Sequence, residues 1–187
     1  MKKELFFVRF LKNPLKIGAV FPSSRFLATR MIEKINFKTA KVIIEYGPGT
    51  GVFTKELLKH QQKDTLVVLI ESDPYFYQKL VEKYSGKKNI IVIHSSAENV
   101  EQILKDLQIT QVDYIISGLP FASLPKSVTQ TILEKTKRVL ETDGYFITFQ
   151  YTLYKLADFK KYFSSISLKK EYRNLPPAYI LSCINKK

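Results

Sequence analysis

Glu45-Tyr46-Gly47-Pro48-Gly49-Thr50-Gly51 is the stretch that decides the fold of this 187-residue chain. It follows the apolar run Val42–Ile44 and precedes a predicted helix over about residues 53–60. Glycine takes positive φ and leaves room where a Cβ would collide with a ligand, so three alternating glycines let the backbone touch a cofactor. The G-x-G-x-G spacing is one residue shorter than in dinucleotide-binding folds. The segment predicts a strand, turn and helix around a cofactor; a plain tight turn is the alternative.

A second acid supports the cofactor interpretation. Glu71 ends the next apolar run, residues 65–70, twenty positions after Gly51. An acid at the tip of the second strand of a doubly wound sheet usually binds a pair of ribose hydroxyls. Glu45, at the end of the first strand, can meet charged or hydroxyl groups of the same ligand. Two acids at successive strand ends therefore favour a ligand site over exposed loop acids.

Apolar runs and helical patterns alternate along the rest of the chain, which is typical of a parallel sheet covered on both faces. Strands are predicted at about 41–46, 65–71, 89–94, 112–117, 144–151, 166–173 and 178–185, and helices at about 53–60, 74–84, 98–107 and 127–140. Asp143-Gly144 is expected to end the last of these helices. The final two strands, separated by residues 174–177, are expected to pair as an antiparallel unit at one edge.

These patterns predict a single α/β domain over residues 1–187, with a Rossmann-like, doubly wound, seven-stranded and mostly parallel sheet. Residues 38–187 form the predicted core. Residues 1–37 form a basic N-terminal arm of helices, one over residues 2–12 and one capped by Ser23 or Ser24 that ends near Ile35.

The formal net charge of +13 indicates an anionic partner, either nucleic acid or anionic lipid. Ten cations and two anions lie in residues 1–41, so +8 of this charge precedes the glycine motif. A helix over residues 2–12 has moderate amphipathicity, and a solvated basic face is the alternative to membrane binding. The predicted membrane-binding residues are Lys2, Lys3, Phe6, Phe7, Arg9, Phe10 and Lys12.

Other features restrict the class of protein. No run approaches the roughly 18 apolar residues that span a bilayer, and no signal-peptide cleavage pattern follows the N-terminus. Cys183 is the single cysteine, and it gives no zinc spacing with His60 and His94. We therefore expect an intracellular protein without a metal site.

Three further segments narrow the interpretation: residues 10–14 through 21–25, Ser117-Gly118-Leu119-Pro120, and residues 173–178. With the glycine motif, they resemble class I S-adenosylmethionine-dependent methyltransferases, and more narrowly the bacterial phospholipid N-methyltransferases. The resemblance implies methyl transfer to the amine of phosphatidylethanolamine, or of other aminolipids such as ornithine lipids. It also implies an N-terminal amphipathic helix, and hence a cytoplasmic protein held peripherally on the inner face of the cell membrane.

The resemblance assigns roles to individual residues. The turn Gly47-Pro48-Gly49-Thr50-Gly51 would approach the methionine part of the cofactor, with Glu45 near its amino group. Glu71, followed by Ser72, would take the ribose hydroxyls. The adenine would be flanked by Ser96, Ala97 and Glu98, although an aspartate is usual where Ser96 stands. Residues 117–120 would lie beside the sulfonium methyl. Tyr151 and Tyr154 would hold the amine, with Phe121 as a wall; the alternative for each tyrosine is half-buried packing.

Two rival functions remain. Residues 24–27, the glycine motif and residues 118–121 also resemble rRNA adenine dimethyltransferases. In that family Asn, or sometimes Asp, stands at the position of Gly118, and an aromatic residue at the position of Phe121 stacks on the flipped base, as Phe121 could here. This chain lacks that side-chain acceptor, and we do not expect the extra helical RNA-binding domain. A non-catalytic membrane- or nucleic-acid-binding module is the second rival; it would show no thermal shift with S-adenosylmethionine.

Overall fold

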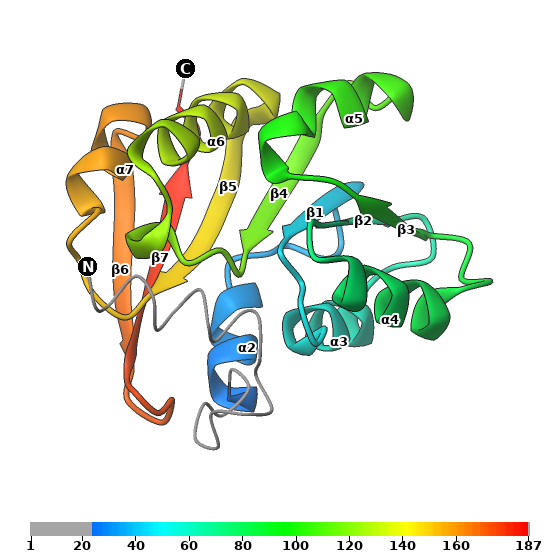
Figure 1. Cartoon of the computed structure of the whole chain (residues 1–187), viewed down its shortest axis with the longest axis horizontal. Coiled ribbons are helices and arrows are strands. Elements are labelled where there is room, and N and C mark those ends of the chain that lie inside the picture. The colour runs from blue at the N-terminus through cyan, green and yellow to red at the C-terminus, as the bar shows by residue number, and fades with distance from the viewer. Residues whose placement is uncertain (1–23, 187) are drawn as a thin grey trace.

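Seven strands form one sheet in the order β3-β2-β1-β4-β5-β7-β6 in the computed structural model, which describes residues 24–186 (Figure 1). The strands are β1 (Val42–Tyr46), β2 (Leu66–Glu71), β3 (Ile90–His94), β4 (Val112–Ser117), β5 (Leu140–Gln150), β6 (Ser165–Glu171) and β7 (Ala178–Ile184). Strands β1 to β5 are parallel, and β7 runs antiparallel between β5 and β6. The predicted doubly wound sheet and its antiparallel end are confirmed.

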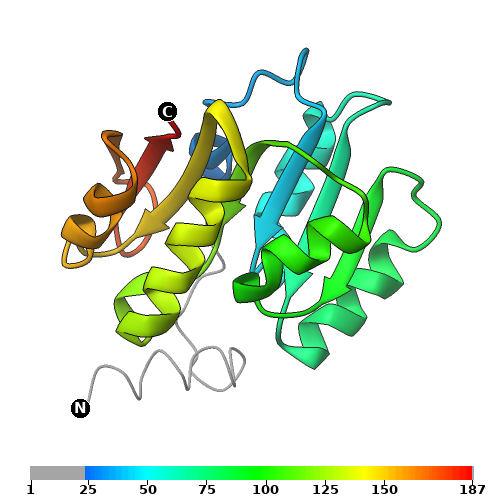
Figure 2. The ribbon, with the colours of Figure 1, turned by 90° about the horizontal axis from the view of Figure 1, so that it is seen from above.

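Helices connect the strands and cover both faces of the sheet (Figure 2). They are α2 (Arg25–Ile32), α3 (Val52–His60), α4 (Pro74–Tyr84), α5 (Val100–Asp106), α6 (Lys126–Val139) and α7 (Leu156–Tyr162), with short 3-10 turns at Ala97–Asn99 and Phe121–Ser123. Local chemistry sets their starts: Ser24 Oγ accepts from the Leu27 amide, and Asp73 caps α4 ahead of Pro74.

Alternation along each strand divides the core into two layers, because successive side chains point to opposite faces. On β1, Ile44 and Tyr46 pack with the layer under α5, α6 and α7. Ile43, their neighbour in sequence, packs with the layer under α2, α3 and α4. Burying one such side chain contributes about 1.5–3 kcal/mol, so both layers stabilise the sheet.

The structure departs from prediction around β5. The prediction that Asp143-Gly144 ends α6 is wrong: α6 ends at Val139 and β5 begins at once, with the pair inside it. Asp143 takes a positive φ of 64°, and a Cβ on Gly144 would lie 2.9 Å from the Asp113 carbonyl oxygen. The side-chain amide of Asn185 donates to carbonyls of this turn, including that of Leu140 at 2.8 Å. A long-range contact from the residue after β7 thus stabilises a turn whose sequence is typical of a helix end.

Two other boundaries differ. Helix α2 ends at Ile32, three residues before the predicted Ile35, and α7 was not predicted at all. Only Phe159 of α7 is fully buried, so the sequence of this helix shows only a weak helical pattern of apolar residues. The predicted helix over residues 2–12 lies outside the described residues. Within residues 24–186, no helix has the length and hydrophobicity needed to cross a bilayer.

Candidate functional site

The carboxyl ends of four parallel strands lie side by side at one edge of the sheet. Strand register aligns Tyr46 of β1 with Ile70 of β2 and with Ser117 of β4. Ser117 in turn aligns with Thr148, near the end of β5. The segments that the sequence placed at strand tips are therefore neighbours, as the doubly wound rule requires of a ligand site.

The glycine turn follows β1 directly. Gly47, Gly49 and Gly51 have φ values of 61°, 53° and 76°, a region that strains residues bearing a Cβ. The turn is tied to β2 by a 2.9 Å bond from the Gly47 amide to the Ile70 carbonyl. A Cβ on Gly49 would meet no atom of the described residues within 4 Å. Glycine thus allows the turn to adopt this conformation without strain, and no described atom crowds its middle residue.

Glu45 is a buried carboxylate with incomplete hydrogen bonding. Its side chain has no exposed surface, and its Oε2 accepts a 2.7 Å bond from Thr54 Oγ1 on α3. Its Oε1 has no partner in the described part of the chain. Burial, with a smaller contribution from nearby Glu71, raises the pKa of Glu45 to about 7, although the hydrogen bonds with Thr54 and the charge of Lys83 act in the opposite direction. A cationic group arriving at Oε1 would satisfy this carboxylate.

Glu71 links the tip of β2 to the glycine turn. It is 5% exposed, its Oε2 accepts from the Gly49 amide at 2.9 Å, and its Oε1 accepts from the Asp73 amide at 2.8 Å. Each carboxylate oxygen keeps a second lone pair. The residue can therefore hold the turn in place and still accept hydrogen bonds from a ligand.

The tip of β4 contacts the same turn at short range. The Gly118 amide donates to the Tyr46 carbonyl at 2.9 Å, and a Cβ on Gly118 would lie 2.7 Å from the carbonyl oxygen of Gly47. A Cβ on Gly47 would lie 2.8 Å from the Leu119 side chain. Ser117 Oγ accepts from the Leu119 amide at 3.2 Å. The close backbone approach leaves no room for a side chain at position 118.

The remaining predicted cofactor residues lie at the tips of β2 and β3, in the glycine turn and after β4. Ser96 Oγ caps a 3-10 turn by accepting from the Glu98 amide, and it also donates to the Glu98 carboxylate, each at 3.2 Å. Ala97 is buried, and Ser72 is exposed with its carbonyl against His94. In the turn itself, Pro48 is buried and Thr50 exposed; Pro120 is partly buried beside Leu119.

The three predicted catalytic residues have different environments. Phe121 is fully buried against Phe146 and Phe159, so it offers no face to a substrate, and the expectation that it walls an amine pocket is not met in this arrangement. Tyr154 is 80% exposed. Tyr151 is half-buried at the end of β5; burial raises its pKa, and a hydrogen bond with Asn174 lowers it in part.

Sequence reasoning missed several groups that complete the site. Thr54 lies on the first turn of α3 facing β1, and a polar residue three places after Gly51 was the available signal. Gln150 is 4% exposed and donates to the Leu119 carbonyl at 3.3 Å, which ties β5 to the β4 tip. Tyr84 Oη is buried beside the turn without a partner among the described residues, and nothing in its local sequence indicated this.

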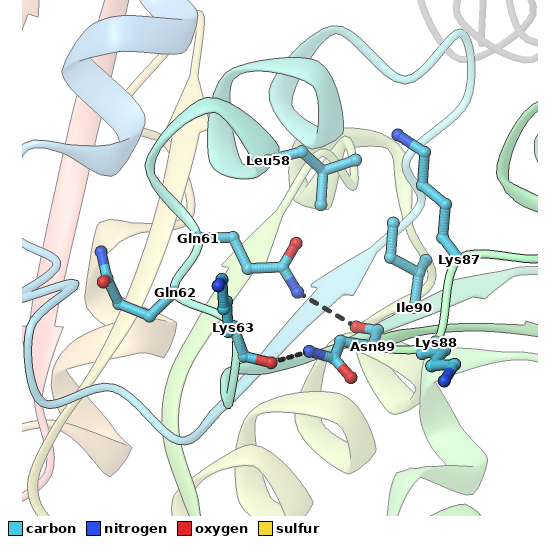
Figure 3. A pocket seen from close by; sticks show the side chains of 8 residues that line it. All are labelled: Leu58, Gln61, Gln62, Lys63, Lys87, Lys88, Asn89 and Ile90. Carbon is cyan, nitrogen blue, oxygen red and sulfur yellow. Dashed lines mark hydrogen bonds between the residues drawn. The ribbon is translucent and has the colours of Figure 1, made fainter.

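A hollow of about 260 Å³ lies elsewhere, at the amino ends of β2 and β3 (Figure 3). The amides of Gln61 and Asn89 in it are bonded to backbone carbonyls, including Gln61 Nε2 to Asn89 O at 3.1 Å. This hollow is shallow and far along the strands from the glycine turn. Its lining residues are Leu58, Gln61, Gln62, Lys63, Lys87, Lys88, Asn89 and Ile90.

Comparison with known proteins agrees with this geometry. Residues 11–172 match the family described as "Ribosomal RNA adenine dimethylase". The ornithine lipid N-methyltransferase of Singulisphaera acidiphila is 33% identical over 96% of this chain and 94% of its own length. Ribosomal RNA small subunit methyltransferase A of Dehalococcoides mccartyi is 28% identical over 71% of this chain, which spans only 43% of that protein.

Solved structures show the same fold. A Thermus thermophilus 16S rRNA N2 G1207 methyltransferase in complex with AdoMet and guanosine superposes with a TM-score of 0.67 at 18% identity, over 92% of this chain and 45% of that one. A Burkholderia thailandensis 1,6-didemethyltoxoflavin-N1-methyltransferase with bound S-adenosylhomocysteine gives 0.69 at 11% identity, over 98% and 87%. At these low sequence identities, the two superpositions show a shared fold and nothing about function.

The fold and the glycine-turn site define a class I S-adenosylmethionine-dependent methyltransferase. The chain belongs to the family of the ribosomal RNA adenine dimethylases and the bacterial lipid N-methyltransferases related to them. The resemblance drawn from the sequence, the enzyme class and S-adenosylmethionine as cofactor are confirmed. Residues 24–186 contain no group of three side chains suited to hold a metal ion.

Proposed function

We propose that this enzyme methylates the primary amine of a membrane aminolipid, such as phosphatidylethanolamine or an ornithine lipid. The supporting observation is the 33% identity to a lipid N-methyltransferase over nearly the full length of both chains. The related rRNA enzyme is matched over less than half of its length. The basic chain, at +13, also suits an anionic lipid surface.

The geometry around Gly118 disfavours the adenine alternative. The resemblance places a side-chain acceptor at this position in rRNA adenine dimethyltransferases, where it accepts from the adenine amino group. Here a Cβ at position 118 would lie 2.7 Å from the backbone oxygen of Gly47, so an asparagine would displace the glycine turn. Phe121, the other base-contacting position, is fully buried. The site thus lacks both contacts by which that family would hold a flipped base.

The chain's residues suit the cofactor in their charge and hydrogen bonding. In the proposed arrangement Glu45 Oε1 accepts from the cationic amino group, and Glu71 accepts from the ribose hydroxyls through its free lone pairs. The open side of Gly49 leaves space for the ligand. Ser96 to Glu98 flank the base. When bound, S-adenosylmethionine supplies an electrophilic methyl group on a sulfonium.

Residues at the tips of β4 and β5 orient the acceptor. A lipid amine must lose its proton before it attacks, and a neighbouring positive charge lowers its pKa. Tyr151, at the end of β5, can hold the amine with its hydroxyl while water takes the proton. Residues Gly118–Pro120, braced by Gln150, set the position of the reacting groups, because methyl transfer requires an in-line approach at about 3 Å.

Labelled S-adenosylmethionine offered with three acceptors tests the proposal. The acceptors are vesicles containing phosphatidylethanolamine or ornithine lipid, ribosomal RNA, and protein. We expect label in the lipid fraction, identified by its chromatographic mobility. Label only in RNA, at adenine, would replace the lipid proposal with the rRNA alternative. A thermal shift with S-adenosylmethionine but no labelled acceptor would show that the substrate belongs to another class.

A pair of variants tests the role of Tyr151. Tyr151→Phe should lower the rate of methyl transfer by about tenfold while leaving cofactor affinity within about twofold, because only the hydroxyl is removed. Tyr145→Phe makes the same change in the middle of β5, where the ring stacks on Tyr114, and should change neither quantity. Equal loss of rate and cofactor affinity in Tyr151→Phe would indicate structural damage instead.

The proposal also places the enzyme peripherally on the inner face of the cell membrane. The residues expected to bind the membrane, within residues 2–12, lie outside the described part of the chain. Each cation near an anionic surface contributes about 1 kcal/mol, and salt weakens the attraction. Deleting residues 1–12 should therefore remove most salt-sensitive binding to anionic vesicles in a sedimentation assay. Unchanged binding would count against this anchor.

A further inference from the structure

The end of β6 and the loop between β6 and β7 turn two polar side chains inward and two apolar ones outward. Glu171 and Asn174 are each 3% exposed, whereas Tyr172 and Leu175 are 72% and 67% exposed. Folding in water favours the opposite arrangement, since buried polar groups must be compensated and exposed apolar groups order water. An inverted loop of this kind indicates a partner for its outer side.

Hydrogen bonds hold this inversion in place. Glu171 accepts from Arg30 Nε at 3.3 Å and from Arg173 Nε at 3.0 Å. Asn174 Oδ1 accepts from the Ser24 amide at 2.9 Å, which binds the loop to the start of α2. The hydrogen bonds of Glu171 and Asn174 therefore fix the loop in a conformation in which Tyr172 and Leu175 are exposed.

Part of the loop backbone is hydrogen-bonded within the loop. The Arg173 amide donates to Glu171 Oε1 at 2.9 Å, and the Pro176 carbonyl accepts from Asn174 Nδ2 at 2.8 Å. Pro176 and Pro177 have no amide hydrogen. A lipid interface penalises unsatisfied backbone groups, so these two internal bonds and the two prolines lower the cost of contact with it.

The loop lies at the same edge as the glycine turn. Strand register aligns Gln150, at the end of β5, with Tyr179 of β7, and Tyr179 with Lys170 near the end of β6. Figure 1 shows the loop projecting past this edge, beside α2. Phe26 of α2, 40% exposed, lies beside the loop because Arg173 stacks on its ring. Leu153 and Tyr154, 37% and 80% exposed, follow β5, whose carboxyl end lies at the same edge.

Cations cover the exposed aromatic rings at this edge. Arg173 Cζ lies 4.2 Å from the ring centre of Phe26, and Lys170 Nζ lies 4.9 Å from that of Tyr172. Lys155 Nζ lies 5.9 Å from the ring of Tyr154. Aromatic rings beside lysine and arginine are the composition of surfaces that lie in the headgroup layer of anionic membranes.

We propose that the β6–β7 loop, residues 172–177, docks on an anionic lipid bilayer together with Phe26 and Tyr154. It forms a membrane contact separate from the N-terminal segment and directs the glycine-turn edge at the lipid headgroups. The inference rests on the proposed function, because only a lipid substrate requires the active edge to face a bilayer.

Tryptophan fluorescence tests the docking directly, since the chain contains no tryptophan. Leu175→Trp, and independently Tyr172→Trp, supply a single fluorophore at the loop. Leu168→Trp is the matched control on β6, where the leucine is 43% exposed. With phosphatidylethanolamine–phosphatidylglycerol vesicles, both loop fluorophores should shift to the blue and be quenched by brominated acyl chains, and the control should do neither.

An unchanged loop emission, measured while the protein sediments with the vesicles, would overturn the proposal. A blue shift with ribosomal RNA and none with vesicles would also overturn it, in favour of an RNA contact. These readings need no catalytic turnover, so they stand even if the enzyme methylates no lipid.

Activity gives a second test. The double variant Tyr172→Ser, Leu175→Ser should lose about tenfold or more in methylation of vesicle lipid, because two apolar anchors are removed. It should methylate a water-soluble, short-chain aminolipid within about twofold of the parent rate, with its thermal shift by S-adenosylmethionine retained. Leu168→Ser should match the parent on both substrates. Equal losses on the vesicle and soluble substrates would contradict a docking role.

Discussion

Two buried glutamates at the same edge of the sheet have opposite environments. Glu171 is 3% exposed and accepts from the guanidinium groups of Arg30 and Arg173, which lower its pKa to about 2. Glu45 is fully buried, has one hydroxyl donor and no partner among residues 24–186 for its other oxygen, and burial raises its pKa to about 7. The charge of Glu171 is compensated by two arginines, and this residue holds a loop in place. The carboxylate of Glu45 has no cationic partner of this kind in that part of the chain, so it is suited to bind a ligand.

The largest expected effect is a difference between the two residues in how the free energy of unfolding depends on pH. Unfolded chains ionise Glu45 near its ordinary pKa of 4.5, whereas the folded protein keeps its proton to about pH 7. The folded state binds more protons in this window, so the free energy of unfolding falls as pH rises from 4.5 to 7, by about 3 kcal/mol. Urea unfolding of the ligand-free protein should show this slope, and Glu45→Gln should lack it. Parallel slopes would contradict the buried, uncompensated state.

The next largest effect is a difference between Glu45 and Glu171 variants in their affinity for the cofactor. Glu45→Gln should weaken S-adenosylmethionine binding by about 10- to 100-fold, since a charge-assisted hydrogen bond contributes about 1.5–3 kcal/mol. Glu171→Gln should bind the cofactor within about twofold of the parent. Isothermal titration calorimetry measures both. If the two variants lose affinity equally, the carboxylates do not differ in function.

The role of Glu171 appears in stability. Its lowered pKa contributes stability that is fully present above pH 4.5 and is lost as pH falls toward 2. Glu171→Gln should lower the free energy of unfolding at pH 7 by about 1–2 kcal/mol; the two half-exposed guanidinium groups reduce the value below that of a buried pair. The deficit should shrink as the pH approaches 2. A deficit independent of pH would mean that packing, and not charge, is lost.

Thr54→Val should have the smallest effect and sharpen the contrast. The hydroxyl of Thr54 is the donor to Glu45 Oε2 at 2.7 Å, and valine has nearly its shape. Its loss removes one hydrogen bond from a hydroxyl donor to Glu45, so cofactor affinity should fall about three- to tenfold. The same calorimetric titration measures it. An affinity equal to that of the parent would indicate that Glu45 binds the ligand without support from α3.

Much of the fold could be predicted because its signals are local. The β1 apolar run, the glycine turn and Glu71 marked a strand–turn–helix–strand unit, and strand tips in a parallel sheet must meet at one edge. The end of α6 was predicted wrongly from Asp143-Gly144, because a dipeptide that often ends a helix can also form an irregular turn within a strand. Here Asn185, from a distant segment, stabilises the turn within the strand. Helix α7 was missed because only one of its side chains is fully buried.

The sequence by itself determined the class of site: glycines that tolerate positive φ, and two acids at successive strand ends. Only the tertiary structure decided which groups are left unsatisfied, because hydrogen bonding and burial depend on residues far apart in the chain. It showed that Thr54 donates to one oxygen of Glu45, that the other oxygen has no partner among residues 24–186, and that Gly118 lies against the backbone of Gly47. It also showed that Arg30 and Ser24 fold the β6–β7 loop with its apolar side outward.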